Sequence, residues 1–235
     1  MQIILRSPFF NCYCLWFLHN YECNRFLLIS IFDTILLIMK IIIARHSEKL
    51  DAPSLSEIGK LRAQALAAQY LGQNAKQSLF IGKERPAALM VMTLHTIETM
   101  APIAASWNMP MLAYWAEAGI DRAHMAVQNV RNQAVAKDLL FSAQYEDKTV
   151  LMIWEHFHIA SAALEAEFAG EKVTLRQLLN LDQMVGVPTT WPDDVYDYFW
   201  IIEYQTGNPV PQSFLMKRQI FTAPFAGLPA ADWPN

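Results

Sequence analysis

Two segments of the chain place a histidine where a buried strand would end. A run of three isoleucines and an alanine leads directly into Arg45 and His46. A second apolar run leads into Glu155 and His156. One guanidinium and two imidazoles suit a tetrahedral anion such as phosphate, because they supply charged and directional donors. One histidine can attack phosphorus while the other stabilises charge on the transferred group. These residue types therefore indicate phosphoryl-group chemistry, provided that the two segments meet.

The surrounding pattern predicts a fold that would bring the two segments together. Short, continuously apolar runs, typical of buried parallel strands, alternate with helical periodicity. The expected strands are 40–44, 86–92, 111–115, 148–154, 196–204 and 213–221, and the expected helices are 56–72, 95–110, 121–140 and 158–170. This alternation predicts an α/β domain built as a three-layer sandwich, in which helices cover both faces of a central, mostly parallel sheet. Ligands bind outside the carboxyl ends of the strands in such sheets, which is where His46 and His156 are expected.

The first expected helix carries its own start and stop signals. Ser54 or Ser56 can cap it, and Glu57 lies three residues after Ser54, as in a capping box. Gly72 fits a C-terminal stop.

Composition excludes some classes of function. The formal net charge is -4 and no basic stripe stands out, so nucleic-acid binding has little support. All three cysteines, Cys12, Cys14 and Cys23, lie near the N-terminus, so no disulfide framework supports the rest of the chain. A zinc site formed by these cysteines would need His19, whose spacing matches no common zinc finger.

The N-terminal residues form a separate question. The apolar run 26–39 is interrupted by Asp33 and lacks the small-residue cleavage site of a signal peptide. A membrane helix needs about 20 apolar residues, which this run reaches only by including 40–44. We interpret 1–38 as a hydrophobic extension that reflects a wrongly assigned start, with a membrane anchor as the alternative. The compact domain is then expected at 39–235 and in the cytoplasm, with membrane association only through the extension.

Four stretches, in order, resemble the histidine phosphatase superfamily, which has the phosphoglycerate-mutase-like fold. Residues 44–49 (ARHSEK) resemble its Arg-His-Gly signature, and 55–71 resemble the helix Leu-Thr-x-x-Gly-x-x-x-Ala that follows. Residues 95–104 (HTIETMAPIA) resemble the segment Arg-Thr-x-x-Thr-x-x-Pro-Leu-Ala. Residues 149–159 (TVLMIWEHFHI) resemble the strand that delivers the second catalytic histidine. The similarity spans about residues 39–165 of this chain, with weaker support from the later strand that follows Trp191.

The resemblance implies a metal-independent phosphatase that works through a phosphohistidine and needs no cofactor. His46 would be the nucleophile, Arg45 a phosphate clamp and His156 the second pocket histidine. Glu117, which follows the third expected strand, would donate a proton to the leaving group. The partner would be a small phosphorylated substrate.

Several positions depart from the family pattern. Ser47 replaces the usual glycine, which leaves the backbone less freedom there. His95 stands where the family has its second phosphate-binding arginine, and an imidazole cannot replace a bidentate guanidinium. A protonated His95 could supply one donor, so activity would depend on pH. Arg62 and Arg85 are candidate substitutes for an arginine that the family often places after its first motif.

These departures leave two hypotheses about function. In the first, the chain is an active phosphatase whose substrate-binding residues include Arg45, His95, Arg62 and Glu155. In the second, it is a catalytically degenerate member of the family that binds a phosphorylated or other anionic ligand. The retention of both histidines favours the enzyme.

Other interpretations of the same residues are simpler. His158 lies two positions after His156 and is the alternative second histidine, although we prefer His156 at the family's spacing. A metal site at Glu155-His156-x-His158 would lack a third ligand in that segment. Asp193 and Asp194 read as turn residues after a proline.

The aromatic residues near the C-terminal strands also have a simple interpretation. Tyr196, Tyr198 and Trp200 alternate along the sequence, which favours packing on one face of an edge strand.

Overall fold

The computed structural model describes residues 38–51 and 53–234, all within a compact unit, Leu36–Asn235. The predictions for residues 1–37 therefore lie outside the described residues. Residues 40–44, which a membrane helix would have to include, form part of a strand instead. In the described part of the chain, no helix is both long enough and apolar enough to cross a bilayer.

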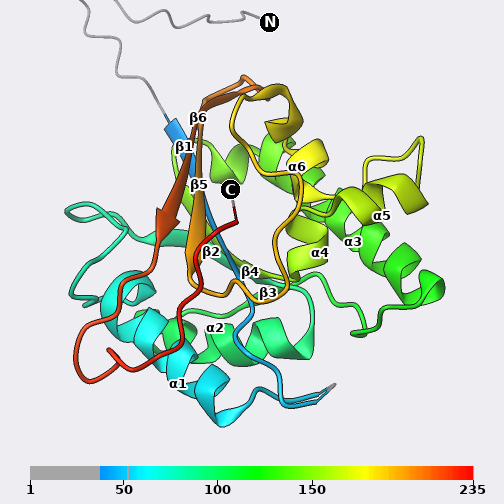
Figure 1. Cartoon of the computed structure of the whole chain (residues 1–235). Helices are drawn as coiled ribbons and strands as arrows, with labels where there is room; N and C mark the ends of the chain where they lie inside the picture. The colour runs from blue at the N-terminus through cyan, green and yellow to red at the C-terminus, as the bar shows by residue number, and fades with distance from the viewer. Residues whose placement is uncertain (1–37, 52, 235) are drawn as a thin grey trace, which may run out of the picture. The chain divides into compact units, whose positions relative to one another are not determined.

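A six-stranded sheet forms the centre of this unit, with the strand order β3-β2-β4-β1-β5-β6 (Figure 1). The strands are β1 (Ile38–Arg45), β2 (Pro86–Val91), β3 (Leu112–Ala113), β4 (Thr149–Trp154), β5 (Tyr198–Gln205) and β6 (Pro211–Arg218). The first four run parallel, whereas β5 pairs antiparallel with β1 and β6 pairs antiparallel with β5. The mostly parallel sheet that the sequence predicts is therefore confirmed.

The helices and short turns connect these strands. They are α1 (Glu57–Leu66), which continues as a π-helical turn (Ala67–Leu71), α2 (Leu94–Trp107), α3 (Arg122–Phe141), α4 (His156–Ile159), α5 (Ala162–Glu167), α6 (Leu175–Leu178), and two 3₁₀ turns (Ala143–Tyr145 and Leu181–Gln183).

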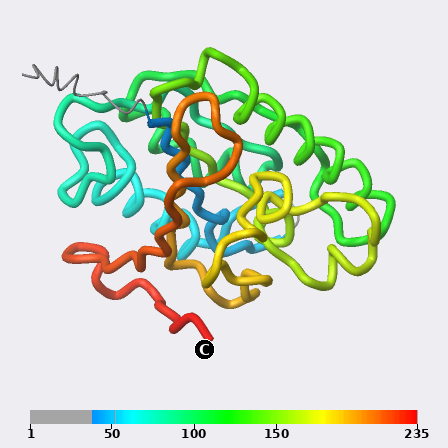
Figure 2. Tube along the Cα trace, turned by 90° about the horizontal axis from the view of Figure 1, so that it is seen from above, coloured from blue at the N-terminus to red at the C-terminus, as the bar shows by residue number. Residues whose placement is uncertain are grey.

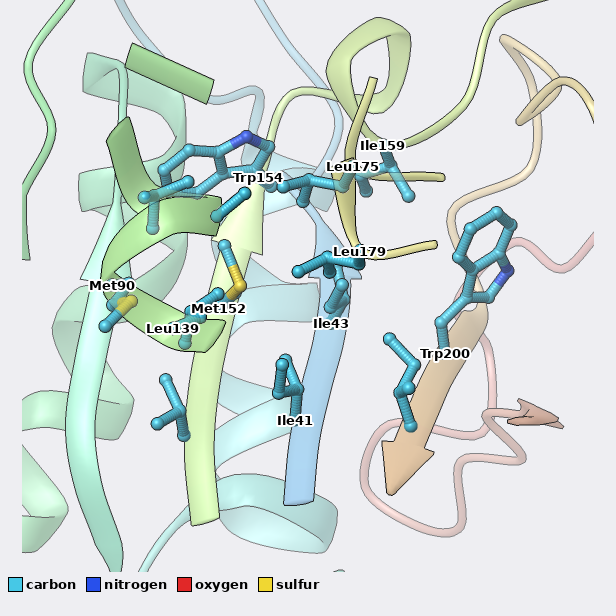
Figure 3. Packing of buried hydrophobic residues seen from close by; sticks show 14 of the residues in the cluster. Ile41, Ile43, Met90, Leu139, Met152, Trp154, Ile159, Leu175, Leu179 and Trp200 are labelled. Carbon is cyan, nitrogen blue, oxygen red and sulfur yellow. The ribbon is translucent and has the colours of Figure 1, made fainter. Parts of the chain in front are cut away.

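Side chains of the central strands alternate between two apolar cores, as the two-residue period of a strand requires. Ile41 and Ile43 face a core that includes Leu139 of α3 and Leu179 next to α6 (Figure 3). Ile42 faces the opposite core, with side chains of α1 and α2. Helices thus cover both faces of the sheet, which confirms the three-layer prediction.

The β5–β6 hairpin lies beside β1, and its turn comes near the start of β1 (Figure 2). Because β5 runs antiparallel to β1, β5 begins at the edge of the sheet where β1 ends. The segment that leads into β5 therefore reaches the carboxyl ends of the parallel strands.

Two local predictions were wrong in detail. The helix expected at 158–170 is broken into α4 and α5, because Ser161 has extended backbone and caps α5 by accepting from the Leu164 N–H. Its neighbour Ala160 accepts a backbone hydrogen bond from Trp191 instead of continuing the helix. The N-cap of α1 is Ser56, so the capping box expected between Ser54 and Glu57 does not form.

The predicted aromatic face also needs correction. β5 is not an edge strand, because β6 lies outside it. Tyr196 precedes β5 and packs against an arginine rather than continuing the strand's pattern.

Candidate active site

The register of β1 and β4 brings the two sequence motifs together. Arg45 pairs with Trp154 at the carboxyl ends of the two strands, and the backbone N–H of His46 donates to the Trp154 carbonyl at 3.0 Å. The residues that follow the two strands therefore lie close together, and the ring centroids of His46 and His156 are 5.7 Å apart.

Arg45 is held almost entirely by groups of the protein. Its Nη1 donates to the carbonyls of Pro192, Asp193 and Val195 at 2.9–3.1 Å. Its guanidinium lies 4.0 Å from the centre of the Tyr196 ring. Burial lowers its pKa to about 10, so it remains a cation at neutral pH. Its Nε is buried and has no hydrogen-bond partner.

His46 presents a free ring nitrogen to the pocket. Its Nδ1 lies 2.7 Å from the Ser47 carbonyl, which can only accept, so Nδ1 carries the proton. Burial lowers the pKa of His46, although Glu155 opposes this shift, so the neutral form with a lone pair on Nε2 is favoured. That nitrogen is buried and makes no hydrogen bond of ordinary geometry, although Oε2 of Glu155 lies 3.3 Å away, and a lone pair on it is what a nucleophile needs.

Glu155 directs its carboxylate into the centre of this pocket. Oε2 lies 3.3 Å from Nε2 of His46 and accepts from Lys49 at 3.1 Å, and Oε1 accepts from the Thr93 hydroxyl. Burial penalises the anion, but Lys49 and the Thr93 hydroxyl hold the pKa of Glu155 well below its usual value, and His46 lowers it further when its ring is protonated. Glu155 is therefore a buried, ionised group.

His156 bridges Arg45 and an aspartate at the rim of the pocket. Its Nδ1 lies 3.2 Å from Nη2 of Arg45, which can only donate, so Nδ1 carries the lone pair. Its Nε2 donates to Oδ1 of Asp193 at 2.9 Å. Burial, with the charge of Arg45, lowers the pKa of His156 to about 2, so the ring is neutral at physiological pH.

His95 and Ser47, the two positions that depart from the family pattern, both lie near His46. His95 lies in the first turn of α2, with its ring 5.7 Å from that of His46. Its Nε2 donates to the Asp51 carbonyl at 2.8 Å, and its buried Nδ1 lies 3.9 Å from Glu155 without a hydrogen bond. Ser47 is not among the described non-glycine residues with positive φ, so it replaces glycine without strain of that kind.

Arg62 lies 5.8 Å from the centre of the Tyr196 ring, which is itself 6.2 Å from the centre of the His46 ring. It makes a bidentate ion pair with Glu48 and donates to the Pro229 carbonyl, while its buried Nη1 has no partner. Arg62 and Glu48 line a cavity of about 470 Å³, which is also lined by Asp193 and Tyr196. Arg62 therefore lies where the remainder of a ligand bound at His46 could extend.

Two candidates lie away from the histidines. The side chain of Glu117 is 81% exposed, 3.9 Å from His124, and lines a separate cavity with Leu94, next to His95. Arg85 lines a cavity with Thr149 at the amino end of β4, opposite the edge that carries His46.

His158 points away from this pocket. Its Nε2 is hydrogen-bonded to Asn129 of α3 at 3.0 Å, and burial lowers its pKa to about 4. The structure nevertheless supplies the third ligand that the local metal motif lacks: His46, Glu155 and His156 each place a ligand atom within 4.8 Å of the others. The segment 155–158 does not reveal this group by itself, because His46 comes from the end of the neighbouring strand.

Four further residues of the pocket were missed. Lys49, Thr93, Asp193 and Tyr196 all contact Arg45, Glu155 or His156. Lys49 follows the Arg-His motif closely enough to have been suspected. The interpretation of Asp193 as only a turn residue was incomplete. Asp193 lies in the segment that leads into β5, and nothing in the local sequence shows that β5 begins beside the end of β1.

No protein-family model matches the chain, and no curated protein matches it. Among solved structures, it is similar to the native structure of mycobacterial glucosyl-3-phosphoglycerate phosphatase. The two share 14% sequence identity with a TM-score of 0.44, over 79% of this chain and 100% of that chain.

Proposed function

We propose that the protein is a metal-independent phosphatase that hydrolyses a phosphomonoester through a phosphohistidine at His46. The observation that carries this proposal is that Nε2 of His46 and Nε of Arg45, on consecutive residues, are both buried and make no hydrogen bond of ordinary geometry. A buried polar atom without a partner costs about 1–3 kcal/mol, and a phosphate would satisfy the arginine while it offers phosphorus to the nitrogen. The resemblance of the Arg45-His46 segment to the histidine phosphatases agrees with this chemistry.

The proposed reaction has two steps. The lone pair of His46 Nε2 forms a bond to phosphorus as the ester P–O bond breaks, and the departing oxygen takes a proton from an acid, for which Glu117 is our candidate. Water then attacks phosphorus, the P–N bond breaks, and a proton of the water returns to the same carboxylate. Arg45 and the Nε2–H of His156 would stabilise charge on the transferred phosphoryl group.

Access to His46 requires the outer groups of the pocket to move. His46 and Arg45 are buried, whereas Lys49 is 34% exposed and Asp193 is 81% exposed. We propose that the phosphate ester displaces these two side chains and that its alcohol portion occupies the cavity beside Arg62.

A second function has its own support. The ionised carboxylate of Glu155 stands 3.3 Å from Nε2, where it would keep phosphorus away from that nitrogen, while the cationic Arg45, whose Nε has no partner, could still attract an anion. A protein that only binds an anionic ligand, without turnover, is therefore the alternative.

Phosphatase activity of the full chain distinguishes these functions. We would assay a panel of phosphomonoesters, including 4-nitrophenyl phosphate, from about pH 5 to about pH 8, with chelator present. A folded His46→Ala protein would serve as the control. Turnover that survives the chelator and vanishes in the variant supports the phosphatase. Folded wild-type protein with no turnover above the variant supports anion binding instead.

A further inference from the structure

We infer that the same pocket is a zinc site, formed by His46, Glu155 and His156. Their ligand atoms lie within 4.8 Å of one another, and all three side chains are buried. Two imidazoles and one carboxylate are a set that zinc uses in sites with an open fourth position. The three come from the ends of two adjacent strands, so the sheet itself holds them in place.

The groups behind His46 fit a metal ligand. A metal-binding imidazole usually donates its far N–H to a carbonyl or carboxylate, which fixes the ring and its tautomer. Nδ1 of His46 makes this contact with the Ser47 carbonyl, so its unpartnered Nε2 carries the lone pair.

His156 has the equivalent arrangement. Its Nε2–H donates to Asp193, which is the carboxylate–histidine pairing typical of metal sites. Its Nδ1 carries the lone pair, which Arg45 Nη2 now occupies at 3.2 Å. A metal at Nδ1 would replace that single hydrogen bond, while Nη1 of Arg45 keeps its three carbonyl contacts.

Two cations limit the affinity of this site. Lys49 lies 3.1 Å from the Glu155 carboxylate, and Arg45 touches His156. Lys49 is partly exposed, so its ammonium can turn to water when a metal arrives. Arg45 cannot leave. We therefore expect a dissociation constant on the order of a micromolar rather than a nanomolar.

Zinc binding and phosphoryl transfer would exclude each other. Nε2 of His46 is the atom that binds the metal and also, in the proposed function on which this part rests, the atom that attacks phosphorus. Zinc would therefore inhibit the enzyme reversibly, and a chelator would restore its activity.

Calorimetric titration of zinc chloride into the full chain tests the site. Because thiolates are strong zinc ligands, Cys12, Cys14 and Cys23 are replaced by serine in every protein used. We expect one zinc per chain at the wild-type pocket. Glu155→Gln should weaken binding about tenfold or more, and Lys49→Met should tighten it about tenfold by removing a repulsive charge. His158→Gln, which removes a buried histidine outside the site, should leave binding unchanged.

Each outcome decides the inference. No zinc binding, or binding that Glu155→Gln and Lys49→Met leave unchanged, would overturn it. If Glu155→Gln does not fold, Lys49→Met and X-ray absorption of the wild-type complex still test it, since the latter must show nitrogen and oxygen ligands at about 2.0–2.2 Å. Zinc binding without any turnover would defeat only the phosphatase proposal. If saturating zinc leaves turnover unchanged, the proposed inhibition by zinc is wrong.

Discussion

The carboxylate of Glu155 lies 3.3 Å from Nε2 of His46, the nitrogen proposed to attack phosphorus. A reacting phosphorus must come within about 3–3.5 Å of its nucleophile, so the carboxylate occupies the space that the phosphoryl group needs. Phosphorus can reach this nitrogen only if the Glu155 side chain moves.

This contact predicts that Glu155→Gln binds inorganic phosphate more tightly at neutral pH. The charged groups that face Glu155 are Lys49 and Arg45, with His46 and His95 beside it. Loss of the negative charge removes the repulsion, so we expect about tenfold tighter binding. Because the pKa of Glu155 lies well below its usual value, wild-type Glu155 stays ionised between about pH 5 and about pH 8, so the advantage of the variant should persist across this range.

Calorimetry of both proteins from about pH 5 to about pH 8 measures this effect, with chelator present. Glu165→Gln, which removes a carboxylate paired with Arg176 instead, is the control. Weaker phosphate binding in Glu155→Gln would contradict this account of the pocket.

The proton donor can be identified with two kinds of substrate. If Glu117 donates to the leaving group, Glu117→Gln should lower kcat on alkyl phosphates about 100-fold but barely affect 4-nitrophenyl phosphate, whose leaving group needs little protonation. Asp193→Asn is the matched comparison, because Asp193 accepts from His156 at the rim of the pocket. If only Asp193→Asn shows the difference between substrates, the assignment of Glu117 is wrong.

Arg45 should matter for stability as well as for ligand binding. Arg45→Lys cannot reproduce the contacts with three carbonyls, Tyr196 and His156, so we expect a loss of about 3 kcal/mol in the free energy of unfolding. Urea denaturation measures this loss. Arg122→Lys, at an exposed ion pair with Glu167, is the control and should change little. Equal effects of the two substitutions would contradict the role given to Arg45.

Buried neutral histidines should make the protein less stable in mild acid. The pKa values of His46, His156 and His158 are all lowered in the folded state, so only the unfolded state gains their protons as pH falls through about 6.5. Each then lowers the free energy of unfolding by up to about 1.4 kcal/mol per pH unit.

Urea unfolding between about pH 6.5 and pH 5 tests this slope, with chelator present. His158→Gln should remove about a third of it while leaving the pocket's own histidines in place. A stability that does not change with pH in this window would show that these rings are not buried as neutral groups.

The sequence was most informative where a pattern is local. Apolar runs predicted the strands that end at Arg45 and Trp154, and their order implied a parallel sheet with both faces covered. The meeting of His46 with His156 followed from these two features.

The rest of the site depends on pairing that no short segment encodes. Asp193 and Tyr196 reach Arg45 only because β5 runs antiparallel to β1 and begins at its carboxyl end. The position of Glu155 in the centre of the pocket, between Lys49 and Thr93, needs the register of separate elements. The sequence could therefore indicate an anion pocket but not the carboxylate inside it.

Detection of a phosphoryl group on His46 tests the central claim most directly. The full chain would be mixed with 4-nitrophenyl phosphate in the presence of chelator, quenched within milliseconds under alkaline conditions and digested for mass spectrometry. We predict an alkali-stable, acid-labile phosphoryl group on the peptide that contains His46, absent from His46→Ala. Turnover by the folded wild-type protein without any phosphorylation of His46 would contradict the mechanism.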